Sequence, residues 1–390
     1  MPSFTAAFST AEDTADALEQ VCAEIRLQLA GAADLALVFV SPHHADHLEK
    51  IAAAVCDVAR TENVLGCTGE SIVAGEQEIE GQPALAVWVA QMPGVRVRPF
   101  HLSFERKPDG GVFTGWPPEL AEGAPPSSTL LLLGEPFSFP ADILIAELNE
   151  NEPVVPVVGG MASGGWGPGQ NKLLLGREVH DEGAVAVLVD GPVRIRTIVS
   201  QGCRPIGRPY VVTKSDRNVI LELSGQTAMQ RLHEVYETLN DRERELVRSG
   251  LHVGRALSEY QDEFRRGDFL VRNVQSADPK SGAIAIGDYV KTGATVQFHI
   301  RDADTADDDL RALLADAMDS GVEPAGALLF TCNGRGTRLF TEDHHDARCV
   351  QAAFNGVPLA GFFAQGELGP VHQKNFLHGF TASLALFEPK

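Results

Sequence analysis

Three stretches of the chain repeat one order of hydrophobic and polar positions. In each, a run of apolar residues precedes a segment with apolar positions at helical spacing, and a second apolar run then ends in glycines. The stretches are residues 33–71, 128–165 and 326–370. Each needs about thirty residues to reach its closing glycines, which is the size of a strand–helix–strand unit. The pattern therefore predicts three such units with neighbouring parallel strands.

The segments between these units have the pattern of antiparallel strands, because their residues alternate between apolar and polar or run apolar up to a tight turn. For example, Val296, Phe298 and Ile300 alternate with Gln297 and His299. Together with the parallel units, these segments predict an α/β fold with mixed sheets flanked by helices.

The length of 390 residues suggests two or three domains. A polar turn at residues 214–218 is the best boundary that the pattern offers. We therefore expect two domains, residues 1–220 and 221–390.

Composition argues against several classes of partner. The apolar fraction is 44% and the charged fraction is 22%, as in globular proteins with a hydrophobic core. The formal net charge is −21. Nucleic-acid binding and docking on an anionic membrane both depend on clustered Lys and Arg, so we expect neither partner.

The chain shows no targeting or membrane signal. Its N-terminus lacks a basic start followed by an apolar block, and its apolar runs are far shorter than the roughly 18 residues of a membrane span. The six cysteines are scattered without a Cys-x-x-Cys pair, which favours reduced thiols. We expect a cytoplasmic protein.

The glycine turns that follow strands of the predicted units, at residues 66–70, 159–169, 332–336 and 361–367, are the strongest candidate for a binding site. They follow strands at the sheet edge where ligands bind in open α/β sheets, and glycine allows the backbone to approach a ligand closely. The alternative is that tight turns need glycine whether or not a ligand binds. The candidate ligand-binding residues are Cys67, Thr68, Glu70, Gly159, Gly160, Ser163, Cys332, Asn333, Arg335, Gln365 and Glu367, with Arg204 from a further loop.

The glycine-rich loop at residues 159–172 is not a phosphate loop. It lacks the spacing GxxxxGK[ST], and the apolar run after it indicates a strand rather than a helix. We interpret the loop as a mobile flap over a pocket, with Trp166 as its apolar part.

Two histidine clusters, at residues 43–47 and 342–346, raise the question of a metal site. Both follow predicted strands at predicted helix starts, where polar residues are common, and His43 and His47 would need further ligands from elsewhere. We interpret both clusters as solvated helix ends and expect no metal. The sequence also gives no evidence for a cofactor.

Cys332 is the best candidate nucleophile, because it lies in a glycine loop near Arg335, whose positive charge favours a thiolate. With His378 and Glu367 it would form a Cys/His/Glu set, although such a set can be drawn in most chains of this size. A buried structural thiol and a thiol that contacts a ligand are the alternatives.

Eight stretches of the chain have the order and spacing of one known family: VFVSPHHAD, LGCTGES, VVGGMASGG, SQGCRPIG, ELSGQTA, FLVRN, ALLFTCNGRG and PLAGFFAQGELGP. In these stretches the chain resembles the FIST family, the F-box and intracellular signal transduction proteins, with an N-terminal and a C-terminal FIST domain. The resemblance implies a sensory protein that binds a small ligand, such as an amino acid or a related metabolite. Because the chain ends at Lys390 without an output segment, we expect an unidentified protein partner in signalling.

For an amino acid ligand, Glu70 and Glu367 would attract the amine, and Arg335 and Arg204 would pair with the carboxylate. The backbone amides of Gly159 and Gly160 would supply further donors. Two other hypotheses stay open: an enzyme that uses Cys332 as nucleophile, and an interaction scaffold without a pocket ligand.

Overall fold

The structure, a computed structural model, describes all residues of the chain except 108–109, 122, 126, 260–262 and 265–266. The chain divides into two compact units. The first unit comprises Met1–Val199, Leu310–Leu377 and Thr381–Lys390, and the second comprises Ser200–Asp309 and His378–Phe380. In the sequence, the second unit interrupts the first at residues 200–309 and 378–380.

The first unit contains the three predicted strand–helix–strand units. Both strands of each unit pair in parallel, as the apolar pattern predicts. The units are β2 (Leu35–Val40), α2 (Leu48–Ala59) and β3 (Val64–Thr68); β9 (Thr129–Gly134), α4 (Ala141–Leu148) and β10 (Val157–Met161); and β22 (Gly326–Cys332), α8 (His345–Phe354) and β23 (Leu359–Ala364).

Each strand–helix–strand unit is the centre of a mixed sheet, so the predicted fold class is confirmed. The first sheet has the order β1-β6-β2-β3-β11-β12, the second β25-β24-β10-β9-β13-β7-β8 and the third β14-β26-β22-β23-β4-β5. The remaining strands are β1 (Ser3–Ser9), β4 (Ser71–Ala74), β5 (Gln77–Glu80), β6 (Leu85–Gln91), β7 (Arg96–Lys107), β8 (Gly110–Thr114), β11 (Leu173–Leu175), β12 (Glu178–His180), β13 (Ala184–Asp190), β14 (Val193–Gln201), β24 (Glu367–Val371), β25 (Lys374–His378) and β26 (Thr381–Pro389).

The three sheets exchange hairpins in a cycle. After β3 the chain leaves the first sheet and forms β4 and β5 at the edge of the third. After β10 it leaves the second sheet and adds β11 and β12 to the first, and after β23 it leaves the third sheet and adds β24 and β25 to the second. The glycine turns that follow β3, β10 and β23 are therefore the points at which the chain crosses between sheets, whereas the turn at residues 332–336 leads from β22 to the next strand of the same sheet.

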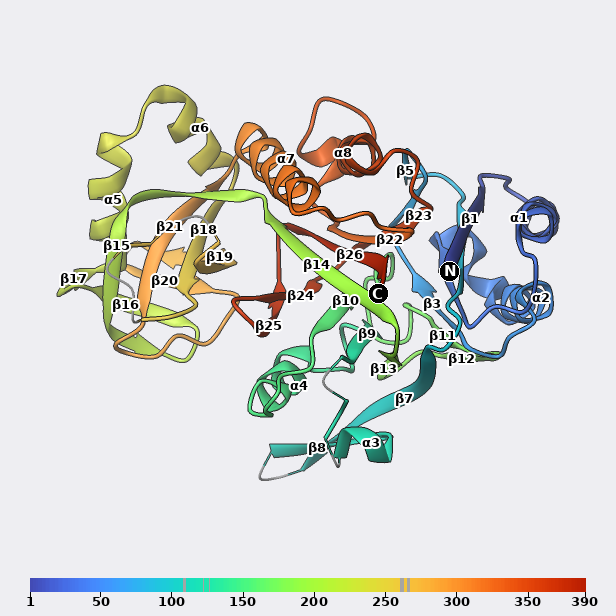
Figure 1. Cartoon of the computed structure of the whole chain (residues 1–390). Coiled ribbons are helices and arrows are strands. Elements are labelled where there is room, and N and C mark those ends of the chain that lie inside the picture. The colour runs from blue at the N-terminus through green and yellow to red at the C-terminus, as the bar shows by residue number, and fades with distance from the viewer. Residues whose placement is uncertain (108–109, 122, 126, 260–262, 265–266) are drawn as a thin grey trace. The chain divides into compact units, whose positions relative to one another are not determined.

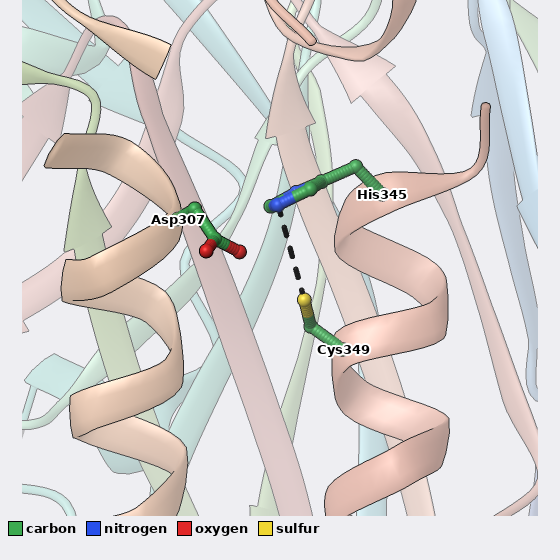
Figure 2. Close-up of side chains that lie close together, drawn as sticks. All are labelled: Asp307, His345 and Cys349. Atoms are coloured by element: carbon green, nitrogen blue, oxygen red, sulfur yellow. Dashed lines mark hydrogen bonds between the residues drawn. The ribbon is translucent and has the colours of Figure 1, made fainter. Parts of the chain in front are cut away.

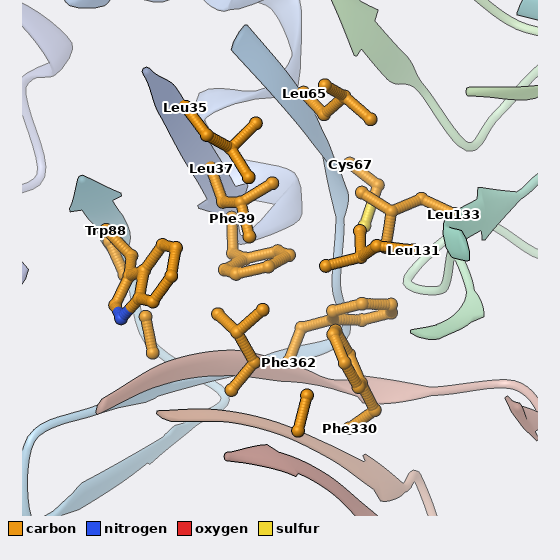
Figure 3. Packing of buried hydrophobic residues seen from close by; sticks show 14 of the residues in the cluster. Leu35, Leu37, Phe39, Leu65, Cys67, Trp88, Leu131, Leu133, Phe330 and Phe362 are labelled. Carbon is orange, nitrogen blue, oxygen red and sulfur yellow. The ribbon is translucent and has the colours of Figure 1, made fainter. Parts of the chain in front are cut away.

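One apolar core lies between the three sheets, and all three contribute to it (Figure 3). Phe39 of the first sheet stacks on Phe362 of the third at 5.3 Å between ring centroids, and Phe330 meets Phe362 edge-on at 5.7 Å. Leu131 and Leu133 come from the second sheet. Because the central strands are buried on both faces, they read as continuous apolar runs.

Helices cover the outer faces of the sheets (Figure 1). In α2, Leu48, Ile51, Ala52, Val55 and Ala59 recur at helical spacing and are buried against the first sheet. The other helical segments of this unit are α1 (Thr14–Gln28), α3 (Pro118–Ala121), the C-terminal part of α7 (Ala303–Asp319), and the 3₁₀ turns η1 (Pro42–His47) and η2 (Gly336–Arg338). None of the described helices is long and apolar enough to cross a membrane.

The second unit is a closed antiparallel barrel. Its strands follow the order β15-β21-β18-β19-β20-β16-β17, and pairing of β15 with β16 closes the barrel. The elements are β15 (Cys203–Asp216), β16 (Val219–Leu223), β17 (Gln226–Thr227), α5 (Ala228–Thr238), α6 (Asp241–Ser249), β18 (Leu251–Ala256), β19 (Phe269–Asp278), β20 (Ala283–Ile286) and β21 (Thr295–Arg301).

The parallel pairs of the first unit approach each other at three equivalent glycines, each the third residue of its strand: Gly66, Gly159 and Gly361. A Cβ atom at these positions would lie 2.3, 1.9 and 1.8 Å from a carbonyl oxygen of the paired strand. No real Cβ tolerates such a distance, so a side chain here would push the strands apart.

Gly361→Ala tests this constraint. We expect a loss of unfolding free energy of about 2 kcal/mol or more, because the added methyl group overpacks a site lined by backbone. Chemical denaturation measures the loss. Gly167→Ala is the matched control, since its Cβ would meet nothing closer than 3.7 Å. Equal stability of the two variants would contradict the close approach.

Candidate functional site

The glycine turns that follow β3, β10 and β23 lie together, bound to one another by hydrogen bonds. The Ser163 N–H donates to the Thr68 carbonyl at 3.0 Å, and the Ser163 hydroxyl accepts the Glu70 N–H at 2.7 Å. The Gln365 N–H donates to the Met161 carbonyl at 3.0 Å. Distant parts of the sequence thus meet at one end of the three-sheet core.

Several predicted site residues are buried or hydrogen-bonded within the protein where these turns meet. Cys67 is buried in the core, and burial raises the pKa of its thiol well above the ordinary value. Thr68 is buried, and its hydroxyl accepts the Lys172 N–H. Gly159 and Gly160 lie in β10, which runs between β24 and β9 in the middle of the second sheet.

A buried ion pair lies beyond the end of β22. The Arg335 Nε donates to Asp346 Oδ2 at 2.6 Å, and Nη2 donates to Oδ1 at 2.7 Å. Both side chains are fully buried, and Thr331 also donates to Asp346. Burial alone would raise the pKa of Asp346, but Arg335 and then His345 outweigh burial and hold this pKa far below the usual range. Asp346 is therefore ionised.

Two further buried carboxyl groups surround Arg335. Burial raises the pKa of Glu367 to about 8, and burial together with the charge of Asp346 raises the pKa of Glu78 to about 8. Both groups are therefore mostly protonated at neutral pH. Glu367 Oε2 accepts hydrogen bonds from the Thr381 N–H and hydroxyl, and Glu78 Oε1 accepts the Ala347 N–H.

The cluster around Arg335 also contains buried polar atoms without a partner. Among the residues that the structure describes, no protein group hydrogen-bonds to Arg335 Nη1, Asn333 Oδ1, Glu78 Oε2 or Glu367 Oε1. Buried polar atoms are nearly always hydrogen-bonded, and an unpaired one costs about 1–3 kcal/mol. Buried water or a small polar molecule can satisfy such atoms.

The other charges proposed for ligand binding already have partners. Glu70 forms an ion pair with Arg338. Arg204 belongs to the second unit, where it donates to Asp302 at 2.8 Å and Glu243 at 3.0 Å. We expected the guanidinium group of Arg335 to bind a ligand carboxylate through two hydrogen bonds. Its Nε and Nη2 atoms bind the carboxylate of Asp346 instead. Only Nη1 is left for a ligand.

The remaining candidates differ in exposure. Gln365 is exposed, and the loop side chain Trp166 is 84% exposed. Cys332 is half-buried at the end of β22, where the Gly334 N–H points at its sulfur at 3.5 Å. His378, its expected catalytic partner, belongs to the second unit.

One interpretation of the sequence is wrong. Residues 342–346 are not a fully solvated helix end: Glu342 and Asp343 are exposed, but His345 and Asp346 are 6% and 0% exposed. Charged residues at a helix start are usually exposed, so the sequence predicts that His345 and Asp346 contact solvent. The ion pair with Arg335 explains why Asp346 is buried. The other cluster is mixed: His43 and His47 are exposed, whereas His44 is buried and contacts Thr14 at 2.9 Å.

The chain matches two family models, described as FIST N domain over residues 34–226 and FIST C domain over residues 228–370. It is similar to the uncharacterized protein Rv0628c of Mycobacterium tuberculosis (strain ATCC 25618 / H37Rv), with 44% identity over 97% of this chain and 98% of that protein. It is also similar to the uncharacterized protein Mb0898c of Mycobacterium bovis, with 42% identity over 97% of each chain.

Glu367 makes stability depend on pH. Its pKa of about 8 in the folded protein exceeds the ordinary value of 4.5, so between these values the folded chain binds more protons than the unfolded chain. The unfolding free energy therefore falls as pH rises through this range, by up to about 1.4 kcal/mol per pH unit for each such group. We expect Glu367→Gln to flatten the decline, as measured by denaturation at several pH values.

Glu76→Gln is the control for this measurement, because Glu76 is exposed and lies two residues from the buried Glu78. It should leave the decline unchanged. A Glu367→Gln profile parallel to that of the unmodified protein would show that Glu367 is ionised in the folded state.

Proposed function

From the premise that this chain belongs to the FIST family, we propose that it is a sensory protein whose small polar ligand binds around Arg335. FIST domains are generally associated with signal transduction and small-ligand sensing. The observation that carries the proposal is the set of four buried, unpartnered polar atoms on Arg335, Asn333, Glu78 and Glu367.

A buried carboxylate in the second strand–helix–strand unit can be compared with the four unpaired atoms near Arg335. Glu135 follows β9 at the place in the second strand–helix–strand unit where Asn333 follows β22 in the third. Glu135 is fully buried, yet its Oε2 accepts the Phe137 and Ser138 N–H groups and its Oε1 accepts the Asn171 amide. A buried carboxylate with a purely structural role is thus fully paired, and this contrast supports a ligand for the unpaired atoms near Arg335.

An amino acid has the matching chemistry. One oxygen of its carboxylate would accept a hydrogen bond from Arg335 Nη1, and its ammonium group would donate to Asn333 Oδ1 and to the carboxyl groups of Glu78 and Glu367. A cation beside two protonated carboxyl groups favours their ionised form. Binding would therefore release protons near neutral pH.

We further infer a cytoplasmic location and a protein partner that carries the signal onward. All six cysteines are free thiols, which supports a reducing compartment. The absence of clustered positive charge in a chain of net charge −21 supports a protein partner over a nucleic acid.

A thermal-shift screen against amino acids and related metabolites tests the proposal. A ligand at 100 times its Kd adds about 2.7 kcal/mol of stability, so its melting temperature shift is readable. We expect Asn333→Ala to weaken binding at least about tenfold, since one charged hydrogen bond is worth about 1.5–3 kcal/mol and about 1.4 kcal/mol corresponds to a factor of ten. The proton release is checked by calorimetry in buffers of different ionisation enthalpy.

Gln365→Ala is the matched control, because this amide belongs to the same group of turns but is exposed. It should bind the ligand as the unmodified protein does. A panel without any shift, or a shift that Asn333→Ala leaves intact, would count against a ligand at this site.

A further inference from the structure

A thiol and an imidazole face each other on α8 (Figure 2), and Asp346 of the buried ion pair directly follows the imidazole in the sequence. His345 and Cys349 are four residues apart, which places both side chains on one face of the helix. The distance from Cys349 Sγ to His345 Nε2 is 4.0 Å. On the other side of the ring, His345 Nδ1 lies 2.9 Å from Asp346 Oδ1. Thiol, imidazole and carboxylate thus form a Cys–His–Asp arrangement within five residues.

The surroundings hold the imidazole in place. Asp346 orients the ring through Nδ1, and Asp346 is itself held by Arg335 and Thr331. The ring of Phe340 stacks on His345 with 3.5 Å between centroids and 10° between planes. Nε2 therefore points at the sulfur with little freedom to turn away.

The imidazole carries a positive charge. Burial alone would lower the pKa of His345, but the hydrogen bonds with Asp346 and then Cys349 raise it to about 10. A charged imidazole beside a sulfur stabilises the thiolate, which is the reactive form of cysteine. Burial raises the pKa of the Cys22, Cys56 and Cys67 thiols.

We propose that Cys349 is a redox-active thiol that His345 activates for oxidation by small hydroperoxides. The Cys349 thiolate attacks the outer peroxide oxygen, so that an S–O bond forms and the O–O bond breaks. The leaving oxygen takes the proton from His345 Nε2. The sulfur is oxidised to a sulfenic acid, and the peroxide is reduced to water or an alcohol.

Because Cys349 is buried, only a small oxidant can reach its sulfur. The residue is 5% exposed and packs in the apolar cluster that joins α7 and α8 to the third sheet. A protein disulfide is too large to reach such a sulfur, whereas hydrogen peroxide is about as small as water. The activity would be a response to peroxide that does not depend on the ligand proposed for Arg335.

The test uses the full chain and counts oxidation at each cysteine. The protein is treated with EDTA, because imidazole and thiolate also bind zinc, and then with hydrogen peroxide for increasing times. Catalase stops the reaction, the protein is unfolded, and iodoacetamide labels the thiols that remain. Mass spectrometry of peptides then gives a separate oxidation rate for each cysteine.

Cys22 is the matched control inside the same molecule, since it also lies on a helix and is also 5% exposed. We expect Cys349 to be oxidised at least about tenfold faster than Cys22, and His345→Gln to bring the two rates together. Equal oxidation rates of Cys349 and Cys22 in the unmodified protein would overturn the proposal. This comparison does not need the variant, so it holds even if His345→Gln fails to fold. A fast Cys349 in a folded His345→Gln variant would overturn the role of the imidazole.

Discussion

Paired parallel strands in the first unit approach so closely at Gly66, Gly159 and Gly361 that their backbones leave no room for a side chain. This close approach occurs once in each strand–helix–strand unit. It fixes the distance between the two paired strands at that point. Beyond the glycine of each unit, the chain crosses into the neighbouring sheet. The three sheets are thereby linked in a cycle around one core, and the crossing turns are brought together at one end of it.

The third unit differs from the other two in the polar groups at its strand end. Arg335 and Asp346 neutralise each other without contact with water, and burial keeps Glu78 and Glu367 mostly protonated. The cluster thus carries little net charge in a chain whose formal net charge is −21. Hydrogen bonds between a small ligand and this cluster would be strong, because water is excluded and does not weaken them.

Asp346 connects the two activities that we propose. Its Oδ2 accepts from Arg335 and Thr331, and its Oδ1 accepts from Arg335 and contacts His345. The proposed ligand would bind Arg335 Nη1 and leave both hydrogen bonds to Asp346 in place. Oxidation of Cys349 would change the neighbour of His345 on the other side of the same carboxylate.

The sequence alone predicted the three strand–helix–strand units and their glycine turns, since a strand buried on both faces must be apolar throughout and a crossing turn favours glycine. It also pointed to Arg335 and Glu367, because polar residues at strand ends are conspicuous beside apolar runs. Only the tertiary structure decided that Asp346 occupies the fork of Arg335, that Glu78 of β5 joins them, and that Arg204 is paired within another unit. These contacts join residues up to about 270 positions apart, as in the bond from the Ala347 N–H to Glu78, and local patterns of hydrophobic and polar residues carry no information about such pairs.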